Sequence, residues 1–131
     1  MVALRLFKTS SFARFARRQR ISDASLRDAV RRAERGLLDA QLGGGVVKQR
    51  VARPGQGRSG GYRVLLAYRA GALSVFLYGF AKNERGNIND EELATLRDIA
   101  KAWLQADAGT LARAIADGLL EKVEHGEEEK A

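Results

Sequence analysis

The sequence of 131 residues lacks, or nearly lacks, several residue types on which common active sites depend. It has no cysteine, which excludes a disulfide scaffold and a metal site built from thiolates. Its single histidine, His125, lies in a polar stretch, which argues against most zinc sites and against Ser-His or Cys-His catalysis. One proline and no long apolar run exclude collagen-like, proline-rich and membrane-spanning classes.

Length and apolar content limit the number of domains. Apolar residues make up 45% of the chain, which is enough for one compact core and not for two. We therefore expect one domain over residues 1–131, of which residues 107–131 form a helical extension. Residues 1–20 contain no apolar stretch of signal-peptide length, so the sequence predicts a cytoplasmic protein.

Positive charge is concentrated in the first two thirds of the chain. The sequence has 23 basic and 16 acidic residues, a net charge of +7, but residues 1–85 carry +13 and residues 86–131 carry −6. Of the basic residues 17 are arginine, whose planar side chain suits paired hydrogen bonds to phosphate. We therefore expect a polyanionic partner, RNA or DNA first of all; the alternative is a basic surface that serves only solubility.

Apolar spacing predicts two helices in the first third of the chain. Residues 4–8 alternate in part, as an edge strand does. Both segments that follow have apolar residues three or four positions apart, and arginines fill the outer side of the first. The apolar positions are Phe12, Phe15 and Ala16 in the first helix and Leu26, Val30, Ala33 and Leu37 in the second. Ser22 and Asp23 are both suitable N-cap residues for the second helix, and the glycines at residues 43–45 are expected to end it.

Three strand-like segments follow, at residues 46–51, 62–69 and 73–80. The connections between them are of hairpin length, so we expect an antiparallel sheet. The segment at residues 53–61 is too rich in glycine for a regular element, and it is predicted to be a loop that carries Arg53 and Arg58.

Two more helices are expected after the sheet. Asn89 is a suitable N-cap for the first of them, with Glu92 in the capping-box position. The second is predicted to carry Leu111, Ile115, Leu119 and Val123 on one side. We expect this helical extension to pack on the domain; the alternative is that its acidic outer face shades an RNA-binding surface. The elements together predict an α+β fold with N-terminal and C-terminal helices packed on a small antiparallel sheet.

Basic residues are expected to converge near the ends of the predicted strands. If the strands are neighbours, six cations gather in one patch: Lys48, Arg50, Arg58, Arg63, Lys82 and Arg85. Like charges assembled in this way indicate a phosphate-binding patch. Tyr62 and Tyr78 lie near the same strand ends and either stack on RNA bases or join the core; for Phe80 the core is favoured.

Two runs of residues resemble one known family. The first is DAQLGGGVVKQR from Asp39, followed by RPGQGRSGGYR up to Arg63, and the second is YGFAKNERGNI at residues 78–88. They resemble the RelE/HigB-type toxins of type II toxin–antitoxin systems, over about residues 5–105. The resemblance implies a microbial-ribonuclease-like α+β fold with helices on one face of the sheet. It also implies mRNA cleavage in the ribosomal decoding site and neutralisation by a neighbouring antitoxin, expected to be a small helix-turn-helix protein.

The resemblance also assigns roles by position. Lys48 and Arg50 take the place of the family's paired basic strand residues, and Arg63 looks like the arginine that contacts the scissile phosphate. Lys82 and Arg85 resemble the basic residues at the end of the last core strand. The nucleophile is the RNA's own 2′-hydroxyl, so the resemblance implies no metal and no cofactor.

Cations must then carry the chemistry. Arg50 and Arg63 are expected to stabilise the charge that develops on the phosphorane oxygens. Arginine stays protonated, so Lys48 is the candidate general base, because neighbouring positive charge favours the neutral form of a lysine. Lys82 or Arg85 is expected to assist the leaving 5′-oxygen.

Two positions and two further functions remain open. Glu84 is an alternative base, although one acid in a basic cluster is more often an ion-pair partner. Asn89 stands where the best-studied branch of the family has a tyrosine that orients the attacking hydroxyl. A relative of the ParE toxins would share the fold and inhibit DNA gyrase, and an RNA-binding module would use the same patch without cleavage.

Overall fold

The computed structural model describes residues 4–53, 57–85 and 87–124, and for residue 53 and residues 57–60 it describes the backbone only. The helices in this part of the chain are α1 (Ser10–Gln19), α2 (Asp23–Glu34), α3 (Asp90–Gln105) and α4 (Ala108–Ala116). The strands are β1 (Arg5–Thr9), β2 (Ala40–Gly43), β3 (Val46–Arg53), β4 (Gly57–Arg69), β5 (Leu73–Ala81) and β6 (Leu120–Lys122). These helices and strands confirm the predicted α+β class. None of the described helices has the length and apolar character needed to cross a membrane.

One sheet joins all six strands in the order β2-β3-β4-β5-β1-β6. Every neighbouring pair is antiparallel except β1 and β5, which run parallel with Arg5 opposite Leu73. On its other side β1 pairs with β6, with Phe7 opposite Lys122. The first strand is therefore enclosed by neighbours on both sides, and the prediction that it is an edge strand is wrong.

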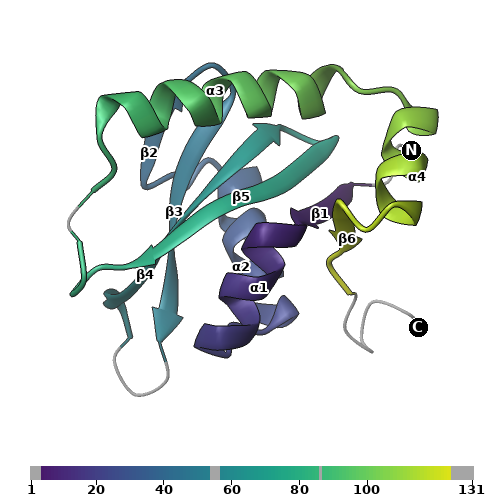
Figure 1. Ribbon diagram of the computed structural model, residues 1–131. Coiled ribbons are helices and arrows are strands. Elements are labelled where there is room, and N and C mark those ends of the chain that lie inside the picture. Colours follow the sequence, from purple (N-terminus) through teal and green to yellow (C-terminus); the bar gives the residue numbers. More distant parts are fainter. Residues whose placement is uncertain (1–3, 54–56, 86, 125–131) are drawn as a thin grey trace.

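Helices cover both faces of the sheet (Figure 1). The core beneath α1 and α2 includes Val64 and Leu66 of β4. The core beneath α3 and α4 includes Leu65 and Ala67 of the same strand. Successive residues of β4 thus enter opposite cores, which explains why the middle of this strand is apolar without alternation. The arrangement differs from the single covered face that the family resemblance implied.

The helix starts agree with the sequence, whereas the end of α2 does not. Ser22 caps α2, and Asn89 with Glu92 forms the predicted capping box of α3. However, α2 ends at Glu34, and Leu37 lies outside it with 57% of its surface exposed. The glycines at residues 43–45 form the turn from β2 to β3 instead of ending a helix.

The turn from β2 to β3 allows α3 to lie close to the sheet. Gly45 has a φ of +84°, a conformation that favours glycine. A Cβ atom at this position would lie 2.5 Å from Cδ1 of Leu104 in α3, which is closer than real contacts allow. Glycine is therefore required here both by the backbone and by the neighbouring helix.

The C-terminal part differs from the predicted continuous helix. The last helix ends at Ala116, and Gly118, with a φ of +78°, turns the chain into β6. Leu119 is 53% exposed, whereas Leu120 and Val123 are buried. The helical spacing of residues 111–123 was therefore misleading in its second half, because strand pairing with β1 decides which side chains are buried there.

Candidate nucleic-acid interface

Three of the predicted site residues lie together on one face of the sheet. Val47, Gln49 and Val51 of β3 point towards α2, so Lys48 and Arg50 between them point to the opposite face. Arg63 of β4 lies between two residues of the core under α1 and α2, and it points the same way as Lys48 and Arg50. We call Lys48, Arg50 and Arg63, together with Arg85, the basic face.

The register of the strands places two of these cations opposite each other. Arg50 lies opposite Arg63, and Arg63 lies opposite Phe80 of β5. Arg63 is buried, with 5% of its surface exposed, whereas 48% of the Arg50 side chain is exposed. Like charges directly opposite each other on neighbouring strands are electrostatically unfavourable, so this register concentrates positive charge on the basic face.

An acid outside the predicted set holds the two cations of β3. Asp39 accepts a hydrogen bond from Nε of Arg50 at 2.8 Å, and its other oxygen lies 4.0 Å from Nζ of Lys48. Its own backbone N–H donates to Oε1 of Gln49 at 2.9 Å. Arg50 thus binds Asp39 through Nε alone. Its two Nη groups make no hydrogen bond with a described residue, and they remain available to a phosphate.

Gln49 anchors this arrangement in the core. It is completely buried, and its amide group donates to the carbonyl oxygens of Ala29 and Leu37 at 2.8 and 3.1 Å. With Oε1 accepting from the N–H of Asp39, the side chain has partners at both ends. A buried amide with this many partners resists movement, so the backbone at Asp39 is held from within the fold.

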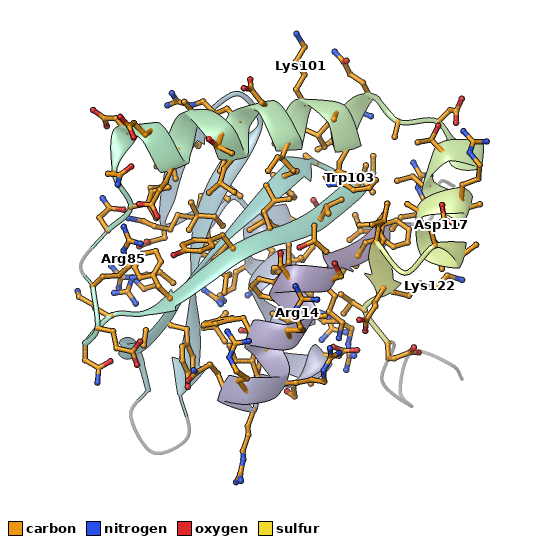
Figure 2. All side chains as sticks on the ribbon, viewed as in Figure 1. Arg14, Arg85, Lys101, Trp103, Asp117 and Lys122 are labelled. Atoms are coloured by element: carbon orange, nitrogen blue, oxygen red, sulfur yellow. The ribbon has the colours of Figure 1, made fainter. Side chains whose placement is uncertain are left out.

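Arg85 joins the basic face from the turn after β5. Its guanidinium donates to both oxygens of Glu92 in α3 at 3.0 and 2.6 Å, and to the hydroxyl of Tyr78 at 3.1 Å. It also lies over the ring of Phe80, 5.7 Å from its centre. Figure 2 shows Arg85 at the end of the sheet near the start of α3.

The ion pair between Arg85 and Glu92 changes the proton affinity of both groups. The hydrogen bonds from Arg85, and then the one from the N–H of Asn89, lower the pKa of Glu92 to about 2. The hydrogen bond to Glu92 raises the pKa of Arg85 above its ordinary value. Both groups therefore stay charged over the physiological range, and Arg85 acts as a fixed cation.

The structure does not place the other predicted charged residues of the site in the basic face. Lys82 is exposed, and its side chain makes no hydrogen bond or ion pair within the described part of the chain. The side chains of Arg53 and Arg58 lie outside the described residues. Glu84 is exposed in the turn that follows β5.

The two tyrosines differ, and the suggestion that Tyr62 stacks on RNA is wrong. Tyr62 is 2% exposed on the opposite face of the sheet, where its ring meets that of Phe15 and its hydroxyl donates to Oε1 of Gln19. Tyr78 is half-buried and its hydroxyl accepts a hydrogen bond from Arg85, so it lies beside the basic face. Phe80 is buried in the core, as predicted.

Sequence reasoning missed two acids, Asp39 and Glu92, as partners of the cations. Asp39 begins the first family-like run, but nothing in its spacing shows that it meets Arg50. Glu92 was recognised for its capping role, and the same side chain also holds Arg85. Asn89 uses its side chain to cap α3, which is a structural role different from that of the tyrosine it replaces in the resemblance.

A hollow of about 620 Å³ lies beside the segment that precedes β2, next to Arg50 of the basic face. It is lined by Arg32, Leu37, Leu38, Asp39, Gln49 and Arg50. The hollow leaves room for a ligand beside the exposed guanidinium of Arg50. Within the described residues no three histidine, cysteine or acidic side chains are grouped so as to hold a metal ion. The arrangement suits the binding of an anion by fixed guanidinium groups.

Comparison with known proteins identifies the family. A search of curated proteins finds no match. The model of a family described as the RelE toxin of the RelE/RelB toxin–antitoxin system matches residues 4–123, from the residue before β1 to the residue after β6. Such a toxin implies a cognate antitoxin as its partner. The match covers nearly the whole chain, and the chain therefore belongs to the RelE toxin family of toxin–antitoxin systems.

Proposed function

We propose that the chain is an endoribonuclease of the HigB type that cleaves mRNA on the ribosome and so inhibits translation. The observation that supports this proposal most directly is the row of Arg50 and Arg63 on neighbouring strands, with Lys48 two residues along β3. Guanidinium groups placed side by side fit the non-bridging oxygens of one phosphate. The family match supports a toxin, and this row supplies a site at which a phosphate can be bound.

The RNA supplies the nucleophile of the proposed reaction, and the basic face supplies the charged groups around it. The 2′-oxygen of the RNA attacks the adjacent phosphorus, and the bond from phosphorus to the 5′-oxygen breaks. The products are a 2′,3′-cyclic phosphate and a free 5′-hydroxyl. A base removes the 2′-hydroxyl proton, and an acid delivers a proton to the leaving oxygen. Negative charge on the phosphate increases in the transition state, where fixed cations stabilise it.

The proposal gives a role to each member of the basic face. Arg63, which is buried in the sheet, and the Nη groups of Arg50 would stabilise the phosphate oxygens. Lys48 is the candidate base, and the carboxylate of Asp39 would offset part of the positive charge near Lys48. Arg85, held by Glu92, would stabilise the leaving oxygen, with Lys82 as the other candidate.

The setting follows from the same proposal. A site without histidine and without a metal is expected to be slow in isolation, so the ribosome would complete the geometry around the mRNA. The toxin would then act in the cytoplasm. A small helix-turn-helix antitoxin would neutralise it, and its gene would adjoin that of the toxin.

The experiment is induction of the chain in growing cells, with and without Arg63→Ala. We expect growth arrest and cleaved transcripts with the original chain, and neither with the variant. The loss of one such transition-state contact costs about a hundredfold or more in rate. Arg69→Ala at the other end of β4 is the matched control and should remain toxic, since Arg69 contacts the carbonyl of Leu104 far from the basic face.

Two other outcomes would overturn the proposal. Growth arrest with intact transcripts and gyrase-dependent DNA damage would show a gyrase inhibitor like the ParE toxins. RNA bound in cells without cleavage, and without any effect of Arg63→Ala on growth, would show an RNA-binding module.

A further inference from the structure

The outer side of α1 carries a second group of cations that the basic face does not include. Its members are Arg14, Arg17, Arg18 and Arg20, which are all exposed. Arg14 and Arg18 lie one turn apart, opposite the buried Phe12 and Ala16, and residues 10–20 contain no acid. We call these four residues the arginine face of α1.

These arginines are hardly neutralised by the rest of the protein. Arg17 lies 3.4 Å from Glu121, but both side chains are largely exposed, and such pairs are weak. Arg14, Arg18 and Arg20 form no ion pair within the described part of the chain. Because α1 packs against the opposite side of the sheet from α3, the arginine face is separate from the basic face.

Arg20 occupies a backbone conformation that disfavours arginine. It ends α1 with φ 58° and ψ 39°, in the left-handed region, where its N–H bonds to the carbonyls of Ala16 and Arg17. Every other described residue with a positive φ is glycine. Glycine would adopt this cap without steric strain, so the arginine side chain is present at an energetic disadvantage. Such an outlier indicates a functional role for the side chain.

We propose that the arginine face of α1 binds the phosphate backbone of double-helical RNA. Arginines at successive turns of a rigid helix match a row of phosphates, and phosphate contacts of this kind orient a protein without reading sequence. On a ribosome-bound substrate, such a contact would hold the domain while the basic face engages the mRNA. The choice of RNA over DNA rests on the proposed function.

The composition of this surface favours a polyanion over a protein partner. Protein interfaces use arginine too, but they place it beside large apolar or aromatic side chains at their centres. The large apolar residues that are exposed in the structure are Leu37, Ile99 and Leu119, and all three lie outside α1. The exposed side of α1 offers serine and arginine instead, so its attraction is almost entirely electrostatic.

The test measures RNA binding directly and needs no cleavage. The purified full-length chain is titrated against a fluorescent RNA duplex by anisotropy, at a series of KCl concentrations. Each phosphate contact adds about 0.9 to the magnitude of the negative slope of log K against log salt on a DNA duplex, and we expect a similar contribution on an RNA duplex. The double variant Arg14→Gln/Arg18→Gln should therefore reduce this slope by roughly two units and weaken binding at low salt.

The matched control removes the same charge elsewhere. Lys101→Gln/Arg113→Gln changes two exposed cations of α3 and α4, and Figure 2 shows that Lys101 lies on the other side of the sheet from Arg14. We expect its slope to stay close to that of the original chain. If the two double variants weaken binding equally, net charge and not the arginine face is responsible, and the proposal fails.

Arg20→Gly separates binding from folding. The variant should unfold at the same or a higher temperature, because glycine relieves the left-handed cap. It should nevertheless bind the RNA duplex less tightly, with a slope lower by about one unit. A variant that binds RNA as tightly as the original chain would overturn the role of Arg20.

Two further arms complete the test. A DNA duplex bound as tightly as the RNA, with the same loss in the variants, would overturn the assignment to RNA. A polyglutamate peptide that loses binding in the variants while RNA binding is unchanged would assign the face to an acidic protein. Cleavage in cells and binding to an RNA duplex are measured separately. Unchanged duplex binding in the variants would overturn the role of the arginine face without affecting the proposed nuclease activity. Uncleaved transcripts would overturn the nuclease without changing the result of the binding assay.

Discussion

At the scale of single residues, the carboxylate of Asp39 has two effects on the basic face that act in opposite directions. It reduces the net positive charge that an RNA meets at Lys48 and Arg50. It also fixes the direction of the Arg50 guanidinium, because its own backbone is held by the buried Gln49. A neutral amide of the same size removes the opposing charge and also weakens the hydrogen bond that orients Arg50, and the two effects act on different kinetic constants.

Asp39→Asn is expected to tighten the association with ribosome-bound mRNA and to slow cleavage. KM should fall by roughly threefold, as expected for one less negative charge at a partly exposed site. Cleavage by the bound enzyme should fall by roughly 10- to 100-fold, because a misplaced guanidinium no longer meets the transition state. Steady-state cleavage of ribosome complexes gives both quantities.

Asp98→Asn, which removes an exposed acid of α3, is the matched control and should leave both quantities unchanged. A variant of Asp39 with a lower kcat and an unchanged or higher KM would show that the residue serves the fold alone. Restoration of kcat by Asp39→Glu would show that the carboxylate itself is required.

Residue identity predicted part of the site, and strand geometry explains what it missed. The sequence predicts a patch of six cations, and the register brings three of them, Lys48, Arg50 and Arg63, together on two neighbouring strands. Tyr62 immediately precedes Arg63 in β4, so the two side chains must point to opposite faces. That signal was present in the sequence. The meeting of Asp39 with Arg50 was not, because it depends on how the segment between α2 and β2 folds back.

At the scale of elements, the N-terminus of α3 is tied to the turn after β5. Glu92 closes the capping box by accepting from the N–H of Asn89, and it also holds Arg85. One side chain thus starts a helix and fixes a cation of the basic face. The low pKa of Glu92 reports this double role.

Glu92→Gln is expected to change the acid stability of the protein. Glutamine preserves the capping box but removes the charge that pairs with Arg85. Since the pKa of Glu92 is about 2 in the folded chain and its ordinary value is 4.5, the carboxylate stabilises the fold above pH 4.5. This contribution is lost as the pH falls from 4.5 to 2.

The variant should therefore be less stable than the original chain at neutral pH and should approach it near pH 2. Thermal unfolding at a series of pH values measures the two curves. Glu91→Gln, the exposed neighbour in the first turn of α3, is the control and should follow the original chain. Parallel curves for Glu92→Gln over the whole range would contradict the ion pair.

Elements with strong local signals were predictable, and short ones were not. Helix caps at Ser22 and Asn89 have side-chain chemistry that can be recognised in isolation. The four-residue β2 and three-residue β6 have too few positions to show alternation. Their existence depends on partners far away in the sequence, as does the parallel pairing of β1 with β5.

At the scale of the whole molecule, the C-terminal segment closes one side of the sheet. Leu111, Leu120 and Val123 are buried there. The end of the segment is also held by Asp23, which accepts from the N–H of Glu124 and from Lys8, both at 2.7 Å. This packing favours a structural role for the segment.

A chain that ends at Gln105 is expected to be less stable but chemically competent. Burial of each large apolar side chain is worth about 1.5–3 kcal/mol before entropy is subtracted, and the truncated chain also exposes an edge of β1 that favours aggregation. Thermal unfolding and ribosome-dependent cleavage per folded molecule measure the two properties. Equal stability with greater toxicity would instead show that the segment inhibits the site.

The position of β1 also sets the order in which the molecule can assemble. Strands β3, β4 and β5 pair with their neighbours in the chain, so the sheet that carries Lys48, Arg50 and Arg63 can form soon after these residues leave the ribosome. By contrast, β1 waits for β5 on one side and, on the other, for a partner as distant as Lys122. During synthesis of the chain, its earliest strand is therefore the last to be enclosed.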